Sequence, residues 1–274
     1  MNEAKGGKRR IRLLVNFLGP FIGLVLVILI FSLLPQIQDR FLRPGNFKSV
    51  ATQSVIVALG ALGMTFIIIS GGIDLSAASN IALSSCVVAF AIDAGLSPWL
   101  GVLLGVLTGG LIGFINGALI TSLRLVPFII TLGMMGIARG AAKWLARNQK
   151  NYAPVTRGYH LLARSPRPAW LLLAPGVWLM IVLAVAAAVV LRTTVFGRHV
   201  FAIGSNEATA RLCGVRTKLT KIVIYSLAGL FCGLSGVMEF SRLTVGDPTV
   251  AIGLELDIIA AVVIGGGSLS GGQG

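Results

Sequence analysis

Long apolar runs follow one another along almost the whole of this chain. Most are close to the roughly 20 residues that a helix needs to cross a bilayer. Because a backbone in lipid must satisfy its own hydrogen bonds, we expect helices, and the alternating pattern of a membrane barrel is absent. The sequence therefore predicts an all-α fold: one polytopic transmembrane helix bundle over residues 1–274, with about seven to eight membrane segments and Gly-broken helices. The runs cover residues 13–34, 50–70, 75–92, 98–122, 126–145, 169–191, 222–240 and 258–265.

Composition supports the membrane interpretation. Of the 274 residues, 55% are apolar and 12% are charged, whereas soluble proteins are about 25% charged. These values exclude a disordered chain, a secreted disulfide scaffold and a water-soluble enzyme. The net charge of +14 does not predict nucleic-acid binding, because the basic residues lie between apolar runs and not on a polar domain. We expect membrane lipid, and no nucleic acid, around this chain.

Residues that hold metals or catalyse reactions are sparse. Cys86 and Cys232 lie in apolar runs, and none of the cysteines forms a C-x-x-C pair. His160 and His199 are far apart in polar loops. We therefore expect no metal centre, no cofactor and no catalytic residue.

Charge asymmetry predicts the orientation. Five basic residues within residues 1–12 precede the first run, so we expect a cytoplasmic N-terminus. The run is longer than the roughly 7–15 residues of a signal-peptide core, so we expect it to be a first spanning helix. Counting crossings from there places Arg124 and the loop 192–221 inside. The loop 143–167 falls outside although it carries six basic residues. Either one boundary is wrong or this loop is basic for another reason.

One run has a glycine on every fourth residue, which places the glycines on one helix face. Such a face lets another helix approach closely. We favour packing within one subunit, and a helix that slides against its neighbour is the alternative. Gly229 and Gly233 form a shorter copy in a later run. The glycines of the main face are Gly101, Gly105, Gly109, Gly113 and Gly117.

A carboxylate and two glycines interrupt the apolar sequence at residues 71–76, Gly-Gly-Ile-Asp-Leu-Ser. Charge at membrane depth is costly and usually functional, and broken helices form substrate sites in many transporters. Residues 265–270 repeat four of these six positions. The pair indicates a transport site, although ordinary turns at helix ends give the same pattern.

Other charges lie in or beside the apolar runs. Arg139 is placed deep in its run. Glu239 and Arg242 are three residues apart, so we favour a local ion pair on one helix face. Glu255 and Asp257 open the last run, where the helix dipole favours carboxylates.

The loop at residues 196–221 is basic, amphipathic and too polar to enter lipid. Asn206 can cap a short helix with Glu207 in its first turn, and Gly214 can end it. Such a helix can dock on a partner, and a solvated connecting loop is the alternative.

The chain resembles the integral membrane permeases of monosaccharide ABC importers, of the ribose, arabinose, galactose and xylose type, which are related to branched-chain amino-acid permeases. The resemblance extends over most of the chain and follows the family's order. It rests on GMTFIIISGGIDLS at residues 63–76, VPFIITLGMMGIARG at 126–140, VFGRHVFAIGSNEATARLCGV at 195–215 and ELDIIAAVVIGGGSLSGGQG at 255–274.

The resemblance implies a permease that works as a dimer with a second copy in the cytoplasmic (inner) membrane. Separate ABC ATPase subunits dock on its cytoplasmic loops, and a periplasmic or extracellular sugar-binding protein delivers the cargo. The segment 206–214 matches the family's coupling helix. The coupling residues implied are Asn206, Glu207, Ala208, Arg211 and Gly214, and those of the translocation path are Gly71, Gly72, Asp74, Ser76, Glu255 and Asp257.

The chain departs from the family pattern in places. Members continue with further spanning helices, whereas this chain ends at Gly274, so we expect a truncated or fragmentary protein. Ala77 and Ala78 replace the usual Val-Gly, and the basic loop 143–167 is atypical. Residues 269–273 spell LSGGQ, a signature of the ATPase subunits, but no G-x-x-x-x-G-K-[ST] loop is present, so we expect no ATP hydrolysis by this chain.

Two alternatives remain at this point. An ion-coupled secondary carrier would use Asp74 as its coupling carboxylate. A non-transporting membrane scaffold would pack through the glycine face. The apolar runs contain no pattern that identifies a sugar as the cargo, so an amino acid or a nucleoside is also a possible cargo.

Overall fold

The computed structural model describes residues 21–152, 162–163 and 172–274. The predicted basic N-terminus (residues 1–12), His160 and most of the loop 143–167 lie outside these ranges. The packing divides the chain into two compact units, Met1–Val50 and Ala51–Gly274. In the described part of the first unit, a helix at Phe21–Leu33 is followed by α2 (Gln38–Phe41) and by the opening turns of α3.

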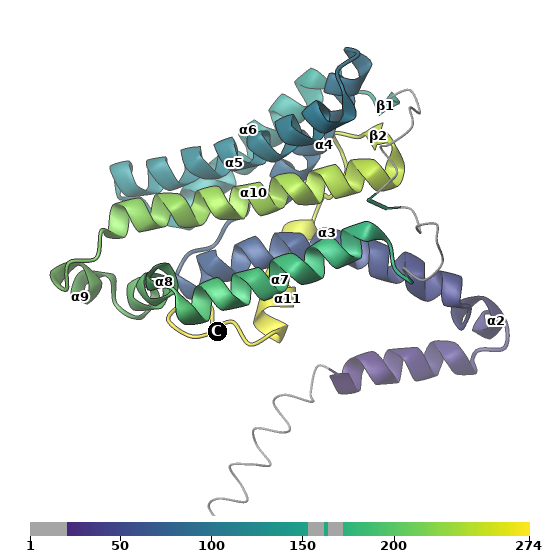
Figure 1. Cartoon of the computed structure of the whole chain (residues 1–274), viewed down its shortest axis with the longest axis horizontal. Helices are drawn as coiled ribbons and strands as arrows, with labels where there is room; N and C mark the ends of the chain where they lie inside the picture. Colours follow the sequence, from purple (N-terminus) through teal and green to yellow (C-terminus); the bar gives the residue numbers. More distant parts are fainter. Residues whose placement is uncertain (1–20, 153–161, 164–171) are drawn as a thin grey trace, which may run out of the picture. The chain divides into compact units, whose positions relative to one another are not determined.

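The second unit is a bundle of helices with one short strand pair (Figure 1). Each predicted apolar run contains a helix. Several begin with proline at the first position, which suits a residue that has no N–H to donate. The elements are α3 (Pro44–Ile69), α4 (Ala77–Asp93), α5 (Pro98–Leu123), α6 (Pro127–Leu145), β1 (Asn151–Tyr152), α7 (Pro175–Thr193), α8 (Val195–Ser205), α9 (Glu207–Leu212), α10 (Thr217–Leu243), β2 (Val245–Gly246) and α11 (Leu254–Ile264).

Five of the described helices, α3, α5, α6, α7 and α10, are long and apolar enough to cross a membrane. The helix Phe21–Leu33 and α4 are apolar but shorter. The fold is thus an all-α membrane bundle, as predicted. The finer count of seven to eight segments depends on Phe21–Leu33, α4 and α11.

The glycine face of α5 packs inside this subunit, which is the interpretation favoured from sequence. A Cβ added to Gly109 would lie 2.5 Å from Gly233 Cα, and one added to Gly229 would lie 2.9 Å from Gly113 Cα. The two glycine series therefore meet, backbone against backbone, between α5 and α10. Asn80 of α4 donates a 3.2 Å hydrogen bond to the Gly109 carbonyl, which ties a third helix to this contact. Sliding along the face stays a prediction.

The bundle has two distinct ends. At one end, which we call the α9 end, the turn between α5 and α6 lies beside α9 and the start of α10, because one pocket is lined by Arg124, Glu207 and Lys221. At the other, the strand end, β1 pairs antiparallel with β2 and Lys150 forms a 3.3 Å ion pair with Asp247. Arg124 and the loop 192–221 therefore share an end, as the count of crossings predicted.

The described part of the basic loop 143–167 lies at the strand end, opposite α9. The predicted boundaries are thus consistent with the structure, and one basic side chain of the loop has an acidic partner at this end. Lys150 pairs with Asp247, and Arg139 Nη1 donates to the carbonyls of Pro248 (2.8 Å) and Val250 (2.7 Å). Lys150 of the loop and Arg139 of α6 thus both contact the segment between β2 and α11.

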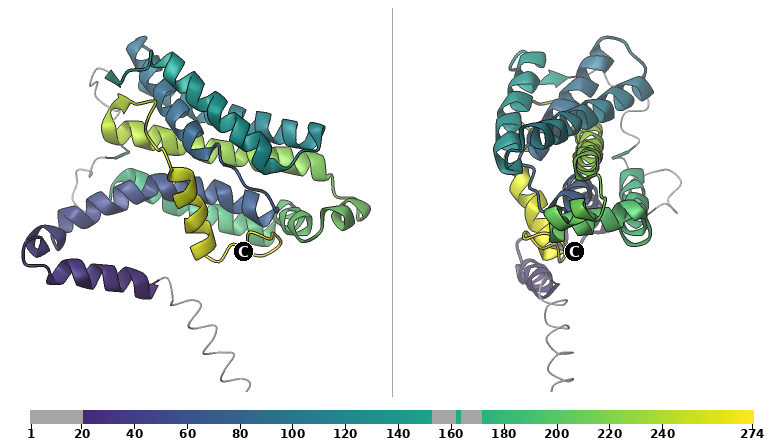
Figure 2. Two further views of the ribbon diagram at one scale, coloured as in Figure 1. Left: turned by 180° about the vertical axis from the view of Figure 1, so that it is seen from behind. Right: turned by 90° about the vertical axis from the view of Figure 1, so that its left-hand side faces the viewer.

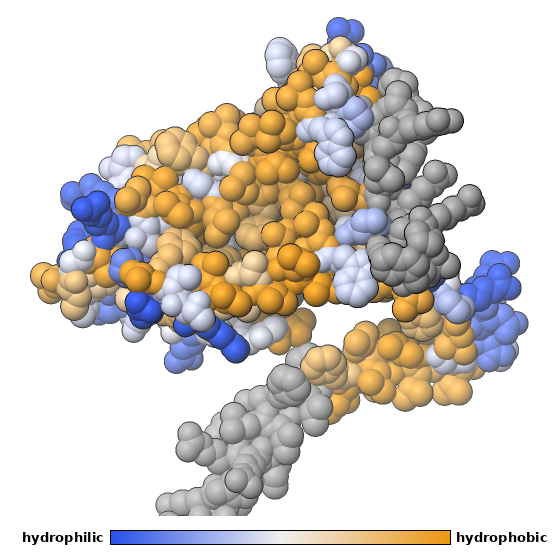
Figure 3. All heavy atoms as spheres, viewed as in Figure 1, coloured by the Kyte–Doolittle hydropathy of each residue, from blue (hydrophilic) through white to orange (hydrophobic). Residues whose placement is uncertain are grey.

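The outer flank of the bundle is apolar. In Figure 3, apolar side chains cover the visible sides of α5, α7 and α10, and hydrophilic ones gather at the α9 end. Leu107, Leu111 and Val182 are each more than half exposed. A surface of this kind is stable against lipid and not against water.

Candidate translocation and coupling regions

The predicted helix break is present between α3 and α4. Gly71 has φ +81°, a left-handed conformation that other residues adopt with strain. Asp74 follows in the connecting segment and is only 2% exposed. Its Oδ1 accepts hydrogen bonds from the backbone N–H of Ser76 at 2.8 Å and from the Ser76 hydroxyl at 2.6 Å. The carboxylate thus closes a tight turn that starts α4.

A second layer of buried polar groups surrounds this turn, and the sequence interpretation missed it. Asn116 of α5 donates from Nδ2 to the Ser76 hydroxyl at 2.9 Å. Its Oδ1, and the hydroxyl of Tyr225 in α10, are buried without a hydrogen-bond partner among the described residues. A Cβ on Gly72 would lie 2.5 Å from that hydroxyl. A lone asparagine in an apolar run was the available signal, since polar side chains in membrane helices hydrogen-bond to neighbours.

The residues that follow the second Gly-rich segment lie against the first segment. Gly272 N–H donates to the Ile69 carbonyl at the end of α3, at 2.8 Å. A Cβ on Gly271 would lie 2.9 Å from Gly71 Cα and 2.8 Å from the Gly204 carbonyl oxygen. Figure 2 shows α11 and the C-terminal segment returning to this place. Both segments follow helix ends, and Gly71, Gly271 and Gly272 lie in close backbone contact beside the end of α8.

The structure does not bring every predicted path residue to the break. Glu255 and Asp257 stand in the first turn of α11, as the dipole argument predicted. The break lies near the other end of α11, because Gly272 bonds to Ile69. Eleven helical residues extend about 16 Å, so these two carboxylates form a separate group.

The ion pair predicted within α10 is present. Arg242 donates to Glu239 from Nη2 at 2.8 Å and from Nε at 3.2 Å. Glu239 is 4% exposed, so the pairing offsets the cost of a buried carboxylate.

The short helix predicted in the polar loop is α9. The Asn206 side chain accepts a hydrogen bond from Thr209 N at 2.9 Å, and Gly214, with φ +85°, follows the helix end. Ala210 is buried against the bundle, whereas Ala208 and Arg211 are exposed and Leu212 is 89% exposed. The helix is thus fixed on one side and free on the other.

Glu207 holds α9 against the start of α10. Its carboxylate contacts Lys221 Nζ at 2.6 Å and Arg211 Nη2 at 3.4 Å. Partial burial would raise the pKa of Glu207, but the hydrogen bond and charge of Lys221, with those of Arg211, outweigh it and lower that pKa below its ordinary value. The carboxylate is therefore ionised at neutral pH and links the start of α9 to Lys221 of α10.

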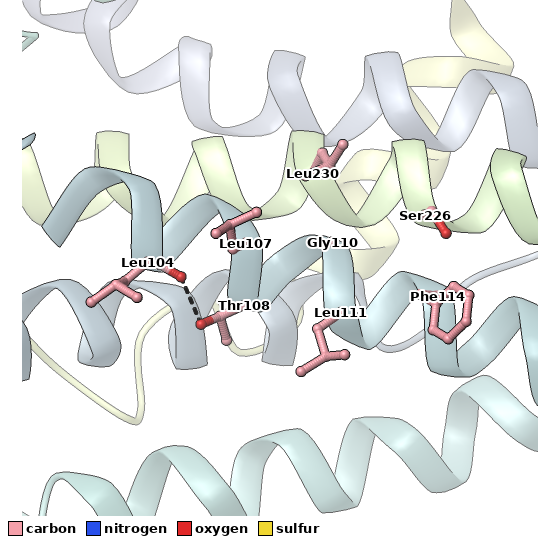
Figure 4. A pocket seen from close by; sticks show the side chains of 8 residues that line it. All are labelled: Leu104, Leu107, Thr108, Gly110, Leu111, Phe114, Ser226 and Leu230. Carbon is pink, nitrogen blue, oxygen red and sulfur yellow. Dashed lines mark hydrogen bonds between the residues drawn. The ribbon is translucent and has the colours of Figure 1, made fainter. Parts of the chain in front are cut away.

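An apolar groove runs along the outer side of α5 and α10 (Figure 4). Its volume is about 550 Å³, and leucines, Phe114 and Gly110 form most of its wall. Its two hydroxyls are engaged within their own helices: Thr108 donates to the Leu104 carbonyl and Ser226 to the Ile222 carbonyl, both at 2.8 Å. Both hydroxyl hydrogens are thus engaged, and the groove offers a hydroxyl-rich cargo no free hydrogen-bond donor from its side chains.

Within the described ranges, no three His, Cys, Asp or Glu side chains are grouped so as to hold a metal ion. The features above define a class: a multi-pass helical membrane protein with a buried helix break and a short exposed helix at one end.

Comparison with known proteins identifies the family. The model of the branched-chain amino acid transport system / permease component family matches residues 46–272. The chain belongs to this family and is therefore a permease component of a transport system.

Curated relatives cover nearly the whole chain. The ribose import permease protein RbsC of Bacillus subtilis is 43% identical over 94% of this chain and 78% of its own length. The L-arabinose ABC transporter permease protein AraH of Azospirillum brasilense is 38% identical over 91% and 73%. The autoinducer 2 import system permease protein LsrC of Photorhabdus luminescens is 33% identical over 92% and 75%. No solved structure matches.

Proposed function

We propose that this chain is the membrane-spanning subunit of an ABC importer that moves a monosaccharide across the cytoplasmic membrane. The observation that carries the proposal is the family match over residues 46–272 together with relatives named as ribose and arabinose permeases. A separate ATPase supplies the energy, and a soluble sugar-binding protein delivers the cargo. We further propose eight membrane segments, with the N-terminus and the α9 end in the cytoplasm.

The exposed side of α9 is the proposed docking surface for the ATPase. Glu207 and Lys221 set the helix against α10, and Ala208 and Arg211 face outward. Opening and closing of the ATPase pair would move α9 and re-orient the helices around the axis of a permease dimer. The helix break at residues 70–76 supports a route for the cargo nearby.

Docking is tested by co-purification of the ATPase subunit with the tagged permease from its native membrane. Glu207→Arg and Ala208→Arg should each lower ATPase recovery, the second without breaking the pairs of Glu207. Thr193→Arg is the control matched to Ala208→Arg, since it also adds one positive charge but at an exposed site outside α9. Unchanged recovery with both α9 variants would reject α9 as the docking surface.

Cargo and energy source are tested by uptake into vesicles that contain the permease, the ATPase and the binding protein. We expect uptake of labelled ribose or arabinose that depends on internal ATP and survives a proton uncoupler. Uptake that collapses with the uncoupler, without need of ATP, would favour the ion-coupled carrier. The match to an autoinducer 2 permease makes that compound the second cargo to assay.

A further inference from the structure

A basic, half-apolar pocket lies beside α9, between the turn that joins α5 to α6 and the start of α10. Its volume is about 350 Å³. Four cations and one carboxylate contribute to its wall, together with an apolar strip. The cations are Arg124, Arg211, Lys218 and Lys221, the carboxylate is Glu207, and the apolar strip is Ile120, Leu125, Val126 and Pro127.

The positive charge of this pocket is only partly neutralised by the protein. Glu207 engages Lys221 and Arg211. Arg124 and Lys218 have no ion pair or side-chain hydrogen bond with any residue in the described ranges, and both are exposed. Arg124 also has φ +55°, a left-handed conformation that costs energy in a residue other than glycine. The turn between α5 and α6 thus places the Arg124 guanidinium in the same pocket wall as the three other cations.

The apolar strip indicates what kind of anion fits. Leu125 is 43% exposed and Val126 is 61% exposed, and they adjoin the ends of α5 and α6, two of the helices able to span a bilayer. A soluble anion would gain nothing from these side chains. A phospholipid would place its phosphate among the cations and its acyl chains along the strip, at the depth where helix ends meet lipid headgroups.

We propose that this pocket binds the headgroup of an anionic phospholipid from the surrounding leaflet. Arg124 and Lys218 contact the phosphate, and Leu125 and Val126 contact the first carbons of the acyl chains. The bound lipid joins the α5–α6 turn to α10 next to α9. The inference does not depend on the transported cargo or on the ATPase.

The test measures which lipid the purified full chain retains. The protein is placed in vesicles of phosphatidylcholine and phosphatidylglycerol in equal amounts, extracted in mild detergent and examined by native mass spectrometry. We expect retained phosphatidylglycerol to exceed phosphatidylcholine. The double variant Arg124→Asn with Lys218→Gln should lower that ratio about thirtyfold, since each cation near the surface favours anionic lipid by about 1 kcal/mol. Asparagine suits the left-handed backbone at position 124, so we expect an unchanged melting temperature.

The matched control is Arg192→Gln with Arg198→Gln, which removes two exposed cations outside the pocket. This variant should keep the wild-type ratio. Equal loss in both double variants would overturn the proposal, because it would show only a diffuse effect of net charge. If soluble glycerol phosphate displaced retained phosphatidylglycerol as strongly as added lipid does, the apolar strip would contribute nothing to binding. The ligand would then be a soluble phosphate and not a lipid. If the variant Arg124→Asn with Lys218→Gln lost ATPase recovery but kept the wild-type lipid ratio, the two cations would serve protein docking and not lipid binding.

Discussion

The contact between α5 and α10 leaves no room for a single methyl group, and this makes Gly109→Ala a sharp test of the packing. The added Cβ would overlap the Gly229 carbonyl oxygen and would lie 2.5 Å from Gly233 Cα and 2.6 Å from Gly233 N. These are backbone atoms, which cannot rotate away. Ordinary contact begins at 3.4 Å, so the two helices must separate by about 1 Å.

The size of the effect follows from two opposing contributions. Overpacking of a well-packed contact costs about 1–3 kcal/mol. Alanine in place of glycine recovers up to about 1 kcal/mol through helix propensity. The net loss is about 1–2 kcal/mol, which lowers the melting temperature by roughly 5 °C in a chain of this size. The separation also lengthens the 3.2 Å hydrogen bond from Asn80 to the Gly109 carbonyl.

The assay is the apparent melting temperature of the purified chain in one detergent, read from the fraction that stays monodisperse after heating. Gly101→Ala is the matched control, because it lies on the same face of the same helix and its Cβ would meet only side-chain atoms at 3.7–3.8 Å. The control should melt at or slightly above the wild type. A Gly109→Ala protein that melts with the control would refute the backbone contact.

Three further outcomes are expected. Because the pKa of Glu207 is lowered in the folded protein, its stabilisation of α9 is present above the ordinary carboxyl pKa and is lost as pH falls through the lowered value. The protection of α9 amides against hydrogen exchange, taken relative to the intrinsic rate at each pH, should fall there, and Glu207→Gln should abolish that fall. Asp74→Asn should preserve folding and uptake, because asparagine retains the acceptor oxygen. Asp74→Ala lacks that oxygen and should lower the melting temperature by several degrees. Loss of uptake in a folded Asp74→Asn protein would favour ion coupling through this carboxylate. Arg139→Met should speed proteolysis near Val250, since its guanidinium donates to the carbonyls there, and an unchanged cleavage rate would contradict that role.

Much of this fold is predictable from local sequence, because lipid imposes helices on apolar runs. The glycine period predicted a close helix contact, and Gly229 and Gly233 were recognised as a second such series. Sequence could not say that the two series face each other, since that depends on the rotation and crossing of α5 and α10. The rotation and crossing of these two helices depend on packing across the whole bundle.

The candidate site was predictable only in part. Asn206 as a cap and Glu207 in the first turn of α9 follow from short-range rules and are confirmed. The partner Lys221 lies fourteen residues further along the chain and was not foreseen. The polar residues around the break were missed for the same reason, because Asn116 meets Ser76 across 40 residues of chain.

Contacts around Gly204 connect the helix break to α9 through closely packed backbone. Gly204 lies in the last turn of α8, and a Cβ there would overlap the Ile69 carbonyl oxygen and lie 2.6 Å from Gly272 N. Asn206 alone separates α8 from α9. Backbone packed this closely resists compression, so a shift of α8 toward α3 would push on the end of α3 and on the turn at Gly71. Under the proposed function, this is how a motion of the docking helix would reach the buried turn that Asp74 closes.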